Sequence, residues 1–316
     1  MQKKETYVDD FFQSFHPSTI WKKYKFVGIK YSILFLGLAH ATLISSYIPA
    51  ISAAIKHIKY NGENSTTILP KTLPYYSWMP FKYDTGYTYL LAILYQGGPM
   101  FSYAYSVVGM DSLFMNLMNC VTANVHIIQG AFYTIRERCA SRLTKNKFHT
   151  TKLLESTEMA KEMDTEMEKI IKHLQTMFKC CHELESMYSI VTLCQVTATL
   201  FILCTCLYLV SMATPFSKQF FAECVYMAAM FFQLYLYCSF GNEVTLKFQE
   251  IPFYLWSSSW LATTTSFKKR MIFTMMRAKK PVYFTVGKFT PLTLSTFVSI
   301  IKTSYSIFAL IKNTSL

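Results

Sequence analysis

The sequence predicts an all-α membrane protein, a polytopic bundle in which five helices cross the bilayer. Hydrophobic residues make up 52% of the 316-residue chain and charged residues only 16%, well below the roughly 25% that is usual in soluble domains. The apolar residues gather in segments of about 20 residues or more, the length of a membrane-spanning helix. We expect one transmembrane domain over 1–316, with spans at 31–55, 86–114, 188–213, 220–240 and 290–312.

The positive charges predict which side of the membrane each connection faces. Most of the 31 Lys and Arg residues precede the first span, lie between the second and third, or follow the fourth. Positive charge collects on the cytoplasmic side, so we expect a cytoplasmic N-terminus and, after five crossings, an extracellular C-terminus. Residues 56–85 then form an extracellular loop, 115–187 a cytoplasmic helical segment and 241–289 a cytoplasmic loop.

The first span contains Pro49, which predicts a kink, and His40, its only ionisable group apart from tyrosines. For a single histidine among apolar residues, hydrogen-bonded packing is favoured over a proton sensor. The loop after this span carries Asn64-Ser65-Thr66, a glycosylation acceptor sequence on the predicted outer side. It ends in LPYYSWMPFKYD at 73–84, whose prolines and aromatic residues suit a cap over a membrane cavity.

The second span is rich in tyrosine and is interrupted by Gly97-Gly98-Pro99. Beyond it, 115–187 combines many charges with apolar residues at helical spacing, and its Glu and Lys residues pair at four-residue intervals. This segment is interpreted either as a solvated extension of the spans or as an assembly surface between subunits, and the two interpretations are compatible. The third and fourth spans are joined by the short link 214–219.

The last span has an unusual polar face. Thr290 followed by Pro291 predicts the start of its helix. Ser295, Ser299, Lys302 and Ser306 then recur at spacings of four, three and four, which places them on one side of a helix. A lysine half-way across a bilayer is costly against lipid, so this face indicates either a pore lining or, alternatively, a packing surface of small residues.

Several function classes lack support in the sequence. No nucleotide-binding loop, zinc-protease or serine-hydrolase motif is present, so we expect no enzyme, no metal and no cofactor. None of the nine cysteines lies in the predicted outer loop, which argues against a disulfide framework. The basic residues alternate with apolar spans and form no patch for nucleic acid.

Four segments identify a family resemblance: YCSFGNEV at 237–244, FTMMRAKKP at 273–281, the terminal VGKFTPLTLSTFVSIIKTSYSIFALIK, and the LP…W-PF-D pattern within 73–84. Together they resemble insect odorant receptors, a family of seven-helix membrane proteins with a cytoplasmic N-terminus and an extracellular C-terminus. The resemblance matches the first span to the family's third helix, so the first two helices are expected to be lacking here.

The resemblance implies an odorant-gated, non-selective cation channel in the plasma membrane of olfactory neuron dendrites. Its expected partners are a small volatile odorant, the lipid bilayer and the shared co-receptor in a hetero-tetramer, with no nucleic acid. Alternatives are a gustatory-type receptor or a non-conducting fragment that acts only in assembly.

The resemblance also implies functional residues. It places the narrow part of the pore near Leu310 and Thr314, with Ser306, Ala309 and Asn313 close by. With the polar face, the expected pore-lining set is Ser295, Ser299, Lys302, Ser306, Ala309, Leu310, Asn313 and Thr314. The expected ligand-binding set is His40, Ile44, Tyr47, Tyr87, Leu91, Tyr95, Met187 and Tyr188, in which aromatic side chains provide dispersion and shape.

Overall fold

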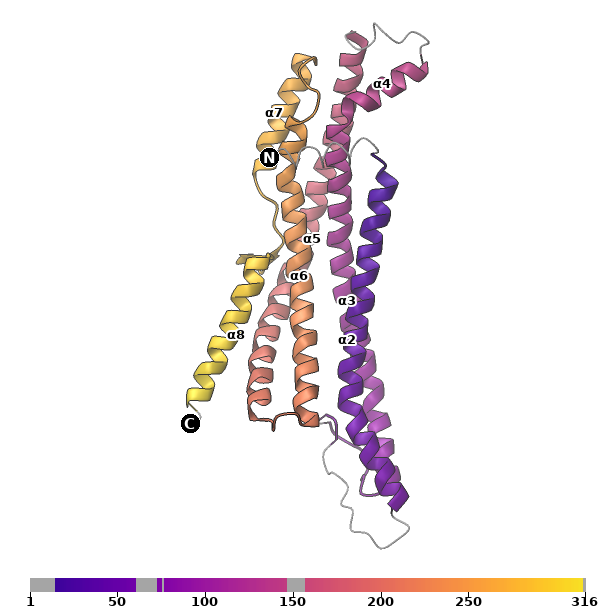
Figure 1. Cartoon of the computed structure of the whole chain (residues 1–316), viewed down its shortest axis with the longest axis vertical. Helices are drawn as coiled ribbons and strands as arrows, with labels where there is room; N and C mark the ends of the chain where they lie inside the picture. The colour runs from indigo at the N-terminus through magenta and orange to yellow at the C-terminus, as the bar shows by residue number, and fades with distance from the viewer. Residues whose placement is uncertain (1–14, 61–72, 76, 147–156, 315–316) are drawn as a thin grey trace. The chain divides into compact units, whose positions relative to one another are not determined.

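The computed structural model describes residues 15–60, 73–75, 77–146 and 157–314, which are helical over most of their length (Figure 1). The predicted all-α class is therefore confirmed. The expected glycosylation residue Asn64 lies outside the described residues. The helices are α2 (Pro17–Tyr60), α3 (Gly86–Tyr133), α4 (Ile135–Asn146), α5 (Thr157–Met212), α6 (Lys218–Trp256), α7 (Thr265–Lys279) and α8 (Leu294–Thr314).

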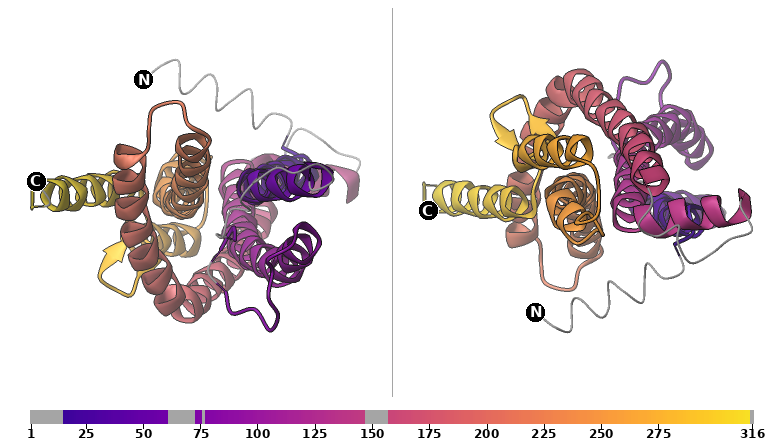
Figure 2. Two further views of the ribbon diagram at one scale, coloured as in Figure 1. Left: turned by 90° about the horizontal axis from the view of Figure 1, so that it is seen from below. Right: turned by 90° about the horizontal axis from the view of Figure 1, so that it is seen from above.

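The chain divides into two compact units, and each long helix contributes to both. Unit 1 comprises Met1–Gly28, Met115–Val196 and Tyr237–Phe297. Unit 2 comprises Ile29–Phe114, Thr197–Leu236 and Val298–Leu316. Within unit 1, α7 lies beside the C-terminal part of α6, and α4 turns away from the direction of α3 after a break at Thr134 (Figures 1 and 2).

The helices are longer than the predicted spans, and four of them are apolar and long enough to cross a membrane: α2, α5, α6 and α8. The helix α3 is not among these four, because its tyrosines, Gln96 and Asp111 reduce its mean hydropathy. It continues without interruption through Gly97-Gly98-Pro99, where the sequence predicted a break. The fifth crossing and the sidedness of the termini stay predictions.

Most of the predicted cytoplasmic loop 241–289 is not a loop. The helix α6 continues to Trp256, and α7 follows after eight residues. Along the extension, Val244, Phe248, Ile251 and Leu255 are all buried, at the spacing that keeps them on one helix face. Burial of that face in unit 1 explains why helix continues beyond 240.

The start of the last helix also differs from the prediction. Thr290 and Pro291 form β2, which pairs antiparallel with β1 (Thr285–Val286). Pro291 has no N–H to donate, and a two-stranded ribbon tolerates this because both of its strands are edges. The helix therefore begins at Leu294, where the Thr293 hydroxyl accepts a hydrogen bond from the Thr296 N–H at 3.4 Å.

The core of unit 2 includes a cluster of side chains from α2 and α3. Its α2 members recur at spacings of four, three and four, so they share one helix face. The segment 73–85 supplies further apolar side chains to the same cluster. Its fully buried members are Leu43, Tyr47, Ala50, Ala54, Tyr89 and Ile93.

Candidate functional site

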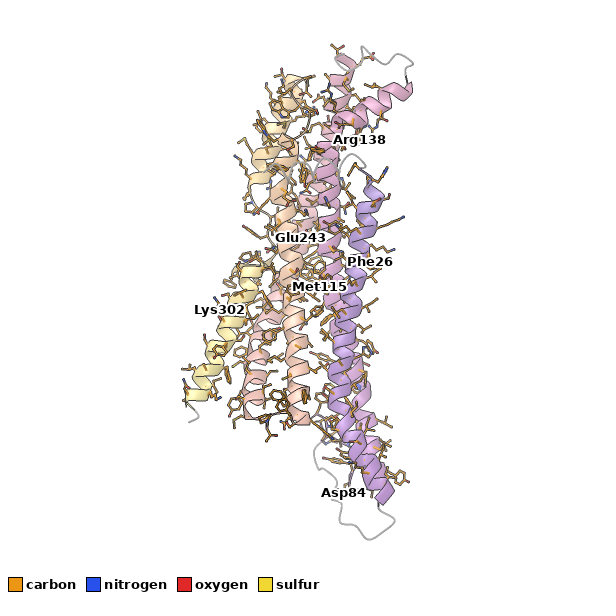
Figure 3. The ribbon with its side chains drawn as sticks, in the orientation of Figure 1. Phe26, Asp84, Met115, Arg138, Glu243 and Lys302 are labelled. Atoms are coloured by element: carbon orange, nitrogen blue, oxygen red, sulfur yellow. The ribbon has the colours of Figure 1, made fainter. Side chains whose placement is uncertain are left out.

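The polar face of α8 is exposed in unit 2. Ser299, Lys302 and Ser306 are exposed, whereas Ile300 and Ser304 on the opposite face are buried. The side chain of Lys302 projects outward from the helix (Figure 3). Of the other expected pore residues in unit 2, Leu310, Asn313 and Thr314 are exposed and Ala309 is half-buried; Ser295, which is also exposed, belongs to unit 1.

Two hydroxyls near the C-terminal end of this face are hydrogen-bonded within the helix. Ser306 donates to the Lys302 carbonyl at 3.0 Å, and Thr314 donates to the Leu310 carbonyl at 2.8 Å. Back-bonding of this kind lets hydroxyls lie in an apolar surrounding. An ammonium group is different, because its three donors and its charge require water or acceptors outside the helix. Lys302 is therefore the residue that decides what this face can contact.

His40 on α2 is hydrogen-bonded through both ring nitrogens. Its Nδ1 lies 2.8 Å from the Leu36 carbonyl oxygen, and its Nε2 lies 2.8 Å from the Tyr105 hydroxyl. A carbonyl can only accept, so Nδ1 donates to the Leu36 carbonyl, and Nε2 shares a hydrogen bond with the Tyr105 hydroxyl. The expectation of hydrogen-bonded packing is confirmed, and His40 links α2 to α3.

Tyr47 lies deep in the unit 2 cluster, with only 6% of its surface exposed. Its ring centroid is 6.0 Å from those of both Tyr75 and Phe101. Gly97 on α3 lies beside this ring, and a Cβ built there would make an ordinary van der Waals contact with Tyr47 Cε1 at 3.9 Å. Of the expected ligand-binding residues, Tyr47 is the one that the structure buries in this aromatic cluster.

Gln96 holds the segment 73–85 against α3. Its amide donates to the Tyr75 carbonyl and, at 2.8 Å, to the Ser77 hydroxyl, while its Oε1 accepts from the Tyr75 N–H at 3.4 Å. Leu73, Tyr75 and Tyr83 of this segment pack on the apolar cluster. Gln96 therefore anchors the segment that the sequence predicted as a cap. The sequence reasoning did not single out this buried glutamine.

The remaining expected ligand-binding residues lie elsewhere. Ile44, Tyr87, Leu91 and Tyr95 are exposed on unit 2, although Tyr95 makes an edge contact with Phe81. Met187 and Tyr188 belong to unit 1, where Met187 is exposed and Tyr188 half-buried. The residues that do surround Tyr47 include Tyr75 and Phe101, and no local sequence pattern indicated them.

A second buried polar contact joins α3 and α6 in unit 2. The Gln233 amide donates a hydrogen bond to the Asp111 carboxylate, and both side chains are buried. A carboxylate removed from water is stabilised by such a donor. The pair therefore fixes the relative rotation of these two helix segments.

Unit 1 contains a cluster of charges where α4 meets α5. The buried Glu166 carboxylate pairs with Arg138 at 3.5 Å, with Lys169 at 2.8 Å and with Arg142. Burial raises the pKa of this carboxyl, but hydrogen bonds from Arg142 and Lys169 outweigh that effect and lower it. Glu166 is therefore held as a carboxylate that joins α4 to α5.

Buried histidine and cysteine side chains in unit 1 stay neutral. Burial, with Lys247 and Lys23 nearby, lowers the pKa of His126 to about 4, and its Nδ1 shares a hydrogen bond with the Tyr24 hydroxyl at 3.2 Å. Burial raises the pKa of Cys139 to about 11 and that of Cys181 to about 12. These thiols are poor nucleophiles, and the described residues contain no group of three or more His, Cys, Asp or Glu that could hold a metal.

One face of α7 in unit 1 is apolar and exposed. Phe267, Met271, Thr274 and Ala278 are buried on one side of the helix. On the other side Ile272, Phe273 and Met276 are exposed, Phe273 by 70%. Exposed apolar side chains that adjoin in this way mark an interaction surface.

Comparisons with known proteins agree on one family. A family model described as 7tm odorant receptor matches residues 23–305. Odorant receptor 94a of Drosophila melanogaster is 22% identical over 245 residues, which are 77% of this chain and 58% of that protein. Odorant receptor 10 of Aedes albopictus is 26% identical over 152 residues, 48% of this chain and 40% of that protein. The matched region thus spans less than two thirds of either relative.

A solved structure has the same fold. The insect olfactory receptor OR5 from Machilis hrabei, in complex with eugenol, superposes with a TM-score of 0.65 at 15% identity. The superposition covers 93% of this chain and 70% of that one. The structure of the same receptor described without eugenol gives a TM-score of 0.64. At this identity the likeness shows the fold.

Proposed function

This chain belongs to the 7tm odorant receptor family, and on that premise we propose that it is an odorant receptor subunit that forms an odorant-gated, non-selective cation channel with a shared co-receptor. The match of the family model over 23–305 carries the proposal. The chain is a multi-pass membrane protein of a receptor family, and no enzymatic activity is part of the proposal.

The exposed polar face of α8 supports a role in the pore. In a bilayer, the ammonium group of Lys302 is stable only against water or acceptor groups of another chain. Ser299 and Ser306 extend the same wet face by one turn in each direction. A ring of such helices from several subunits would line a water-filled path, with Leu310 and Thr314 nearer the C-terminal end.

The apolar face of α7 supports assembly with the co-receptor. Ile272, Phe273 and Met276 expose surface that a soluble single chain would bury. This face fits the apolar centre of a subunit interface. Lys269, Arg277 and Lys279 on the same helix provide a charged rim.

The buried cluster around Tyr47 is the proposed odorant site. It has aromatic and aliphatic walls, and the segment 73–85 covers it. Such walls bind volatile molecules by dispersion and shape. Tyr47 is the expected ligand-binding residue that lies in this cluster, while His40, Ile44, Tyr87, Leu91, Tyr95, Met187 and Tyr188 stay predictions of contact with ligand.

Current recordings test the proposal. We would co-express the chain with an odorant co-receptor subunit in oocytes and apply a panel of volatile compounds. We expect a cation current that depends on this chain for its odorant selectivity, and Lys302→Gln is expected to change its rectification several-fold. The matched control is Lys218→Gln, which removes an exposed charge at the start of α6. Unchanged permeation and rectification in Lys302→Gln would contradict the pore role.

A second candidate function is assembly without conduction. The exposed α7 face favours it, because this face needs only a partner and not a complete pore. Co-purification with the co-receptor combined with odorant-evoked currents no different from those of the co-receptor alone would support this alternative. Failure to co-purify would contradict both candidates.

A further inference from the structure

The Tyr47 hydroxyl is a buried polar group that forms no hydrogen bond with any of the residues that the structure describes. Its side chain is only 6% exposed. Buried hydroxyls are nearly always hydrogen-bonded, because leaving one unpaired costs free energy. Phenylalanine would fill the same space without that cost, so the hydroxyl needs an explanation.

The apolar side chains that pack around Tyr47 are aliphatic residues, Phe101 and other tyrosines. A bridging water needs two to four polar partners to be retained. Small residues line the α2 side at Ala50 and Ala54, and Gly97 lies against the ring from α3.

Hydrogen bonds attach the segment 73–85, which covers this cluster, to α3. Tyr75, whose ring lies 6.0 Å from that of Tyr47, belongs to the segment that Gln96 holds by its backbone. Displacement of this segment would exchange the hydrogen bonds of Gln96 for others with water. A small molecule that displaced it would then reach the Tyr47 hydroxyl.

We propose that the Tyr47 hydroxyl is the polar anchor of the odorant site and that it selects small apolar ligands carrying one oxygen acceptor, such as an alcohol, over hydrocarbons of the same shape. This inference rests on the proposed odorant site. The phenol O–H donates to the ligand oxygen, and the apolar cluster holds the carbon skeleton. Selection follows because only a ligand with an acceptor satisfies the buried donor.

Matched pairs of probes test the inference by binding alone. We would measure binding of 2-phenylethanol against propylbenzene, and of 1-octanol against nonane, to the full chain in detergent by ligand-induced shifts in thermal unfolding. Each pair exchanges a hydroxyl for a methyl group. In the wild-type chain we expect the alcohol of at least one pair to bind about five- to tenfold more tightly, the ratio that one hydrogen bond provides.

The variant Tyr47→Phe should remove this preference. We expect it to weaken alcohol binding about five- to tenfold, to leave hydrocarbon binding within about twofold, and to unfold at the same or a higher temperature without ligand, because no protein partner is lost. Tyr103→Phe, which removes an exposed hydroxyl from α3 of the same unit, is the matched control and should keep the preference.

Three results would overturn the inference: a wild-type chain that binds no alcohol of the panel, equal binding within both pairs, or a clear loss of unliganded stability in Tyr47→Phe. Failure of the proposed channel function is distinguishable, because it would leave the alcohol preference and its loss in Tyr47→Phe intact while no odorant-evoked current is recorded.

Discussion

Unit 1 and unit 2 are built from segments of the same long helices, yet they satisfy their side chains in different ways. In unit 1 Glu166 and Glu168 each bridge more than one basic side chain, and Glu250 pairs with Lys247. Unit 2 exposes large apolar residues along α2, α3 and α5, including Ile33, Leu94 and Phe201. Ion pairs therefore contribute to the packing of helices in unit 1, whereas the helices of unit 2 present long apolar surfaces.

The comparison of the two units distinguishes polar groups that stabilise the fold from polar groups to which we assign a function. In unit 1 buried polar groups help to hold helices together, as in the hydrogen bond from Gln129 to the Lys247 carbonyl at 2.6 Å. In unit 2 the exposed Lys302 is assigned to the pore, and the Tyr47 hydroxyl, which has no hydrogen-bond partner among the described residues, is assigned to the ligand. Substitutions that separate these roles test the comparison.

The largest effect is expected from Glu166→Ala in unit 1. This change leaves Arg138, Arg142 and Lys169 without their shared carboxylate. We expect the free energy of unfolding to fall by about 3 kcal/mol. This value is at the low end for a broken buried pair, because two of the three cations are substantially exposed. Thermal unfolding in detergent measures it. Glu183→Ala, in an exposed pair with Lys179, is the control and should change stability by less than about 0.5 kcal/mol.

Acidification should destabilise unit 1 through His126. Its pKa of about 4 in the folded chain lies below the ordinary value of about 6.5, so the unfolded chain binds the proton first. Stability is full above about pH 6.5 and falls as the pH decreases towards 4, by about 2 kcal/mol. Unfolding measured from pH 7.5 to 4.5 checks this. If His126→Gln showed the same pH dependence as the wild-type chain, another group would be responsible.

Gly287→Ala should destabilise the strand pair that packs on α5. Gly287 has a φ of +58°, and a Cβ there would lie 2.7 Å from Leu193 Cδ2 and 3.1 Å from Leu193 Cβ. We expect a loss of about 2 kcal/mol from backbone strain and overlap together. Gly37→Ala on α2 in unit 2 is the opposite case, because nothing lies within 4 Å of its Cβ and helix propensity favours alanine by about 1 kcal/mol. Equal effects of the two substitutions would contradict the packing described for Gly287.

The smallest effect on stability is expected from Gln96→Leu in unit 2. The leucine keeps the apolar volume but removes the bonds to Tyr75 and Ser77. We expect a loss of about 1 kcal/mol and faster amide exchange across 73–85, measured by hydrogen–deuterium exchange. Gln219→Leu, at an exposed position on α6, should change neither. Unaltered exchange in Gln96→Leu would show that the apolar contacts of Leu73 and Tyr83 hold the segment without it.

Sequence patterns predicted the fold class well, but they predicted the ends of helices poorly. Each of the five apolar segments falls largely within one helix, since apolar length is a property of the chain alone. The continuation of α6 past 240 and the start of α8 at Leu294 depend on what Val244 and Thr290 contact, Val244 in the core of unit 1 and Thr290 in a strand pair with Val286. Such contacts join residues far apart in sequence, so no local pattern indicates them.

The candidate site also combines features that the sequence predicts with features that depend on tertiary contacts. The sequence by itself determined the membrane-protein class, the family resemblance and the polar face of α8 with Lys302, because composition, motif and helical period need no tertiary contact. Only the tertiary structure decided that Tyr47 is buried with an unpaired hydroxyl, that Gln96 anchors 73–85, and that Tyr87 and Leu91 are exposed. The period of a helix tells which residues share a face, but which face is covered depends on the neighbouring elements.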